Sequence, residues 1–79
     1  MTGITRMWEA VAAPGRLDDL LAHVLAAAPS EAGVYRAAGG EPRVVVIDPT
    51  GVGLAGVPAD LVAGRPHEWE FEPVPRQRG

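Results

Sequence analysis

The stretch RVVVID at positions 43–48 decides how the rest of the chain is organised. Its four central residues are apolar and β-branched without any alternation, which is typical of a strand covered on both faces. Such a strand belongs in the middle of a sheet. The glycine-rich turn GGEP at 39–42 joins it to a shorter apolar run, AGVYRA at 32–37. The two runs therefore predict a β-hairpin.

The part of the chain before this hairpin predicts one strand and one helix. The run ITRMWEAVA at 4–12 has large apolar side chains on both parities, which indicates a second central strand. After it, apolar residues recur at the spacing of one helical face, and Pro14 suits a first helical turn. We therefore predict a helix over 14–28. The apolar positions on its face are Leu17, Leu20, Leu21, Val24, Leu25 and Ala28.

The part after the hairpin predicts a loop, a short helix and a last strand. PTGVGLAGV at 49–57 is rich in small and turn-forming residues, so it is expected to form a long loop. A helical piece of at most two turns follows at 58–63. The run HEWEFE at 67–72 alternates strictly, with Trp69 and Phe71 on one face. The other face holds Glu68, Glu70 and Glu72 and is expected to be solvated.

This order of elements predicts an α+β fold, the ferredoxin-like βαββαβ two-layer sandwich, with the first and third strands in the middle. We expect one domain over residues 1–79, with a core at about 4–74 and a frayed tail at 75–79. Helices in this sandwich cover one face of the sheet, whereas the central strands are apolar on both. A chain of 79 residues has no spare segment for the second face. A second copy is therefore expected to cover it, giving a homodimer.

Composition excludes several classes of function. The net charge is −3 and no basic cluster is present, which argues against nucleic-acid binding. No run approaches the length of a membrane span, and the absence of Cys excludes disulfides and thiolate metal sites. We therefore predict a cytoplasmic protein with no membrane partner. Every basic residue is Arg, and Ala and Gly abound, which is typical of a GC-rich bacterial genome.

The first strand running into APGRLD at 13–18, together with the element order over nearly the whole chain, resembles the dimeric α/β-barrel group. Within that group the chain is most similar to the small antibiotic-biosynthesis-monooxygenase-like proteins. The resemblance implies two ferredoxin-like protomers with their sheets face to face. The group includes cofactor-free oxygenases, haem-degrading enzymes, isomerases and proteins of unknown role, so the fold fixes no single activity. Its oxygenases use Asn, Trp and His or Tyr around a cleft between helix and sheet, and this chain has no Asn.

The candidate site residues are one histidine and a set of mostly aromatic side chains. His67 shares a strand parity with Trp69 and Phe71, so it is either a general base or ligand contact, or a strand-start residue at an interface. His23 is expected at the solvent boundary of the helix. No metal site or cofactor is predicted, because no third ligand stands at useful spacing from His67 and its neighbouring glutamates. The candidate ligand-binding residues are Trp8, Tyr35, Arg36, Trp69 and Phe71, which core packing or an exposed edge strand would also explain.

Three functions follow from these residues. The first is a small homodimeric binding or accessory protein with a modest apolar cleft for an apolar or aromatic small molecule. The alternative is a cofactor-independent oxygenase or isomerase acting on an aromatic or polyketide-like substrate. In that alternative His67 is the base, Trp8 and Trp69 are cavity walls, and Tyr35 or Arg36 orients an oxyanion. The third is an interaction module that uses the row of glutamates at 68–72, a row that would also protect an edge strand from aggregation.

Overall fold

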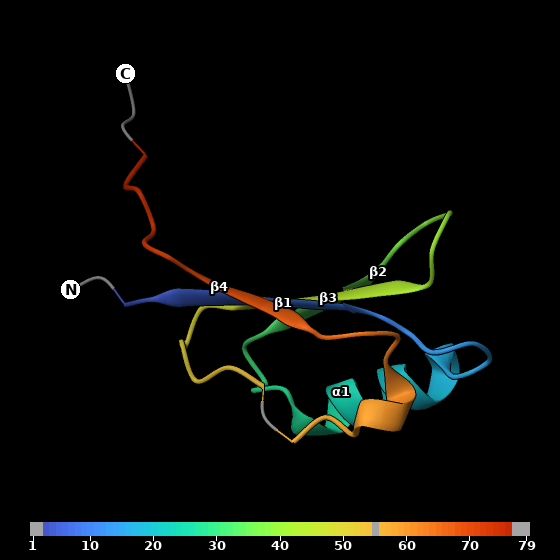
Figure 1. The fold of residues 1–79 in the computed structure, drawn as a ribbon. Coiled ribbons are helices and arrows are strands. Elements are labelled where there is room, and N and C mark those ends of the chain that lie inside the picture. Colours follow the sequence, from blue (N-terminus) through green and yellow to red (C-terminus); the bar gives the residue numbers. More distant parts are fainter. Residues whose placement is uncertain (1–2, 55, 77–79) are drawn as a thin grey trace.

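The computed structural model describes residues 3–54 and 56–76 and shows an α+β fold built on one four-stranded antiparallel sheet (Figure 1). The strand order is β2-β3-β1-β4, so the first and third strands are central, as predicted. Antiparallel pairing joins β1 to β3 and β4, and β2 to β3. The elements are β1 (Thr5–Val11), α1 (Leu17–Ala27), β2 (Gly33–Arg36), β3 (Arg43–Asp48), the one-turn 3₁₀ helix η1 (Ala59–Leu61) and β4 (His67–Phe71).

The hydrophobic core lies between the sheet and α1. Figure 1 shows α1 and η1 on the same side of the sheet, with no helix on the opposite side. Alternate residues of β1 and β3 point into this layer and meet Leu20 and Val24 of α1, both of which are fully buried. The buried apolar residues are Trp8, Ala10, Ala12, Leu20, Val24, Val44, Val46, Leu54, Leu61 and Val62.

The helix begins three residues later than predicted, because Pro14 and Gly15 form a β-turn instead of a first helical turn. The N–H of Arg16 donates to the carbonyl of Ala13 over 2.9 Å and closes that turn. Gly15 has a φ of +75°, the left-handed conformation that a turn with Pro at its second position requires at its third. The helix then starts at Leu17.

The buried face of α1 is narrower than its apolar face. Leu20 and Val24 are fully buried and Leu21 is only partly buried, so the centre of the face lies one residue earlier than expected. The prediction that Leu25 packs in the core is wrong, since 65% of it is exposed.

The second helical piece is shorter than predicted because the chain returns to β1. Val62 has extended backbone and forms an isolated bridge with Ala12. The N–H of Ala63 donates to the carbonyl of Val11 over 2.7 Å, and the N–H of Ala13 donates to the carbonyl of Leu61 over 2.9 Å. These bonds hold the segment against the end of β1 and stop the helix after one turn. The described chain thus has one α-helix.

The last described residues continue beyond the sheet. Residues 72–76 have no regular structure, are exposed, and leave β4 on the side opposite α1 (Figure 1). The predicted frayed tail at 75–79 falls partly outside the described residues, which end at 76. No helix in the described ranges is long and apolar enough to cross a membrane.

Candidate functional site

The sheet face opposite α1, hereafter the open face, gathers most of the predicted site residues. Strand register places them there, because residues that alternate with the buried Trp8, Ala10, Val44 and Val46 must point to the other side. The open face consists of Thr5, Met7, Glu9, Val11, Tyr35, Arg43, Val45, Ile47, His67, Trp69 and Phe71.

Apolar side chains make up most of the open face. Met7 lies between Ile47 and Trp69 in one cross-strand row, and the aliphatic centre of the face is half-buried. The aromatic residues at its edges are more exposed, at 59% for Tyr35, 42% for Trp69 and 50% for Phe71. Contiguous exposed apolar residues of this kind mark a surface for a protein partner or an apolar ligand.

A charged pair lies toward one end of this apolar face, where β3 begins at Arg43 and β4 begins at His67. Arg43 donates from Nη1 to Oε2 of Glu9 over 2.9 Å and from Nη2 to Oε1 of Glu41 over 2.7 Å. The hydrogen bond to Glu9 is the main cause of a raised pKa at Arg43, which keeps the guanidinium charged. The Glu9 side chain is only 16% exposed, although it lies on the uncovered side of the sheet.

His67 lies on the open face beside this pair, as its parity predicted. Its ring stacks on Trp69 with a centroid separation of 5.8 Å, and its Nδ1 lies 3.8 Å from Oε2 of Glu9. A carboxylate beside one ring nitrogen can orient an imidazole ring. Most of the His67 side chain remains in contact with solvent.

The structure does not bring all predicted ligand-binding residues together. Tyr35, Trp69 and Phe71 share the open face with His67. Trp8 pairs with Glu68 across β4, points to the other side of the sheet, and is buried beneath α1. Arg36 alternates with Tyr35 and is exposed on that same side. Trp8 and Trp69 therefore cannot form the walls of one cavity within one chain.

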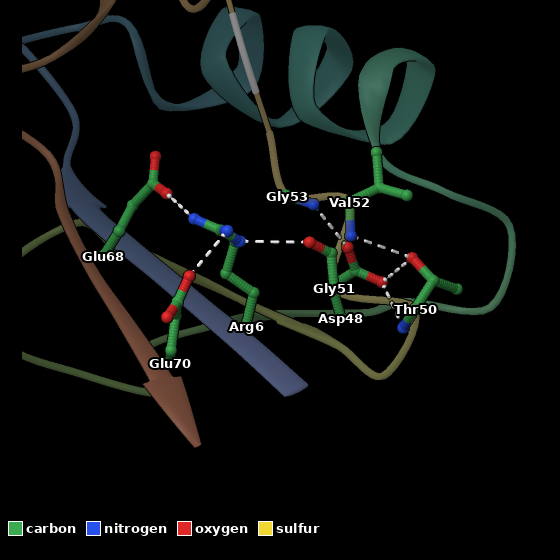
Figure 2. Close-up of polar contacts among 8 residues, drawn as sticks. All are labelled: Arg6, Asp48, Thr50, Gly51, Val52, Gly53, Glu68 and Glu70. Carbon is green, nitrogen blue, oxygen red and sulfur yellow. Dashed lines mark hydrogen bonds and ion pairs between the residues drawn. The ribbon is translucent and has the colours of Figure 1, made fainter. Parts of the chain in front are cut away.

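The glutamates of β4 lie on the helix side of the sheet, where two of them bind Arg6 (Figure 2). Arg6 donates from Nη2 to Oε2 of Glu70 over 2.7 Å and from Nη1 to Oε1 of Glu68 over 3.4 Å. Its Nε donates to the carbonyl of Gly51 over 3.1 Å. Glu68 and Glu70 are thus engaged within the chain, which weakens the hypothesis of a docking row for a basic partner.

A buried carboxylate that sequence analysis missed organises the start of the loop at 49–57. Asp48 is almost fully buried and accepts bonds from the N–H of Thr50 at 2.9 Å, its Oγ1 at 2.6 Å, and the N–H of Gly53 at 2.7 Å (Figure 2). Burial raises the pKa of Asp48, but these bonds and the nearby charge of Arg6 outweigh it, and the net pKa is lowered. The D-x-T spacing is a side-chain turn signal that could have revealed it.

The remaining titratable candidates show no further site. His23 is half-buried, and its Nε2 is shielded from solvent without a hydrogen-bond partner in the described structure. Within residues 3–54 and 56–76, no three acidic or histidine side chains are grouped closely enough to hold a metal ion.

Comparison with protein-family models, with curated proteins and with solved structures finds no match to this chain.

Proposed function

We propose that the protein is a small homodimeric binding or accessory protein that works through the open face. Its sheet corresponds to that of a ferredoxin-like fold in which η1 stands in place of the second helix. Two such sheets would pair face to face, as in a dimeric α/β barrel. The observation that carries this proposal is the exposed apolar face, with Tyr35, Trp69 and Phe71 around an aliphatic centre.

The total surface of the chain is larger than that of a compact monomer, as expected where one face of a sheet is uncovered. The chain exposes 5505 Å², whereas a compact monomer of its mass exposes about 4,600 Å². The excess of roughly 900 Å² means that the chain is less compact than a typical monomer of its mass. The uncovered sheet face and the extended residues 72–76 both contribute to this excess (Figure 1).

The edges of the sheet are less suited than its open face to binding a second copy. Pairing β4 with a second β4 would bring together two rows of glutamates, and like charges on neighbouring strands are destabilising. Pro73 and Pro75 follow directly and lack N–H donors. At the other edge, β2 has only four residues. Both edges thus have features that discourage strand addition.

The ligand class follows from the aromatic side chains. Trp69 and Phe71 on β4 and Tyr35 on β2 border the open face from its two edges. Two facing copies would place these rings around the rim of the space between the sheets, where flat apolar molecules can stack. We infer an apolar or aromatic small molecule as ligand.

Substitution on the open face tests this proposal directly. Phe71→Glu introduces a charge on the open face, and we expect light scattering to report a monomer with an unchanged circular dichroism spectrum. Leu25→Glu is the matched control, because Leu25 is also an exposed apolar residue, at 65% against 50% for Phe71, but lies on α1. It should remain dimeric. If both variants have the same mass as the parent protein, the open face is not the interface.

One contact favours the enzymatic alternative, a cofactor-independent oxygenase or isomerase. Oε2 of Glu9 lies 3.8 Å from Nδ1 of His67, longer than a hydrogen bond but on the ring nitrogen that a carboxylate orients in a general base. With Trp8 on the other side of the sheet, the substrate would contact Trp69 and Tyr35 instead. His67→Gln should then lower turnover of a phenolic or anthrone-like substrate by about 10²-fold. Absence of turnover by the parent protein over such a panel rejects this alternative.

A further inference from the structure

The charged and titratable groups on and beside the open face form one compact cluster. Glu9 on β1 and Arg43 on β3 belong to the two central strands, and their ion pair joins these strands near the end of the face where β3 and β4 begin. His67 on β4 and Glu41 in the β2–β3 connection flank it, and each contacts one member of the pair. The remaining open-face side chains are apolar, apart from the hydroxyl groups of Thr5 and Tyr35.

We propose that the Glu9–Arg43 pair determines which partner the open face accepts and in which register, with each Glu9 facing the partner's Arg43. This inference rests on the proposed homodimer. A charge pair is a dipole, and a twofold axis perpendicular to it generates an antiparallel copy. Each end of the dipole then meets the opposite charge, so the face is complementary to itself.

Covering the open face would take the Glu9 carboxylate out of water. Only 16% of its side chain is exposed, and a partner on the face would remove this remaining contact with water. A carboxylate that loses water needs a compensating partner, and its single strong bond comes from Nη1 of Arg43. The partner's guanidinium supplies a second positive group in one register only. Apolar contacts alone tolerate sliding, whereas a polar group in an apolar interface fixes register.

The same geometry excludes wrong partners. A purely apolar surface, or one with a single charge at this position, would leave Glu9 or Arg43 buried against a group that does not compensate it. A second copy of this chain presents both charges at the required spacing. The interaction surface therefore selects the same sequence.

A charge swap tests this proposal. Glu9→Arg combined with Arg43→Glu keeps an ion pair within each chain, and Glu41→Gln in both parent and swap removes the repulsion that position 43 would otherwise meet. Each protein should form homodimers. When isotopically labelled parent and unlabelled swap are mixed, like charges would face each other across the axis. Native mass spectrometry should then show few heterodimers.

The control is a swap of an ion pair outside the open face. Arg16 and Asp60 lie 3.3 Å apart at the start of α1 and in η1, so Arg16→Asp combined with Asp60→Arg should mix freely with the parent. Free mixing gives about twice as many heterodimers as either homodimer, as expected for random pairing in a closed dimer. The same distribution for the open-face swap would overturn the inference.

Failure of the inference and failure of the proposed function give different results. A monomeric parent protein rejects the homodimer itself. A dimeric parent whose swap mixes randomly rejects only the role of Glu9 and Arg43. If the swap does not fold, Glu9→Gln replaces it, and its dimer should dissociate at a concentration about tenfold higher or more, a change of roughly 1.4 kcal/mol. An unchanged dissociation constant in a folded Glu9→Gln variant also overturns the inference.

Discussion

Trp69 pairs with Met7 across β1 and β4, so Trp8, the next residue along β1, points to the opposite side of the sheet. The two tryptophans of the chain therefore report on different surfaces. Trp8 is 3% exposed in the core, whereas Trp69 is 42% exposed on the open face. This separation lets fluorescence distinguish events on the two sides of the sheet.

Removal of Trp69 should abolish the fluorescence response to an aromatic ligand. In the parent protein, an aromatic molecule bound to the open face would quench Trp69 and leave Trp8 unaffected. Trp69→Phe should emit only from the buried Trp8, at shorter wavelength, without a ligand-dependent change. A ligand response that persists in Trp69→Phe would place the binding site on the helix side.

Replacement of the central helix residue should destabilise the fold far more than replacement of its exposed neighbour. Leu20 is fully buried, so Leu20→Ala should cost about 2–5 kcal/mol of unfolding free energy. Leu25→Ala lies on the exposed flank and should change it by about 0.5 kcal/mol or less. Urea denaturation measures both. Equal losses of unfolding free energy would mean that α1 is rotated about its own axis relative to the structure described.

Stability at low pH should depend on Asp48. Because its pKa in the folded protein lies below the ordinary value of 3.8, the stabilisation from its carboxylate is complete above that value. It is lost as pH falls through the lowered pKa. Asp48→Asn removes charge-assisted bonds and should lower stability by about 2 kcal/mol at neutral pH. The gap between the two proteins should narrow from about pH 4 downward, and a constant gap would contradict the assigned bonds.

Two glycines with similar backbone angles should respond differently to alanine. Gly51 has a φ of +76°, and a Cβ there would approach the carbonyl oxygen of Ile4 to 2.7 Å. Gly56 has a φ of +73° with no atom within 4 Å of such a Cβ. Gly56→Ala should therefore lower the unfolding free energy only by the strain of a left-handed alanine, about 1–2 kcal/mol. Gly51→Ala should cost clearly more in a thermal melt, and a smaller effect than Gly56→Ala would contradict the loop geometry.

The central strands could be predicted from sequence because their cause is local. The β-branched run at 43–48 and the apolar residues on both parities at 4–12 follow from the composition of each segment alone, and β1 and β3 are central. The alternation of HEWEF likewise placed Trp69 and Phe71 on one face, and strand register agrees.

The helical boundaries depended on interactions that local pattern does not contain. Pro14 fits a helix start and a turn equally well, and the bond from Arg16 to Ala13 selects the turn. The second helix stops because the N–H of Ala63 bonds to Val11, some fifty positions away. Helical propensity gives no information about that partner.

Only part of the candidate site could be predicted, because the rest depends on how the strands pair. Parity within one strand relates His67 to Trp69, but only the register between β1 and β4 shows that Trp8 faces away from them. The charged pair had a visible signal, since Glu9 interrupts an apolar parity in a central strand. Its partner Arg43 lies on another strand and required the pairing of β1 with β3.

The most direct test of the account is whether a second copy covers the open face. A sample that mixes isotopically labelled and unlabelled chains, examined by isotope-filtered NMR, detects contacts between chains only. We predict intermolecular contacts from the methyl groups of Met7 and Ile47 and from the ring of Trp69, in a particle of about twice 8.3 kDa. Intermolecular contacts from Leu25 instead, or a particle with the mass of one chain, would contradict the account.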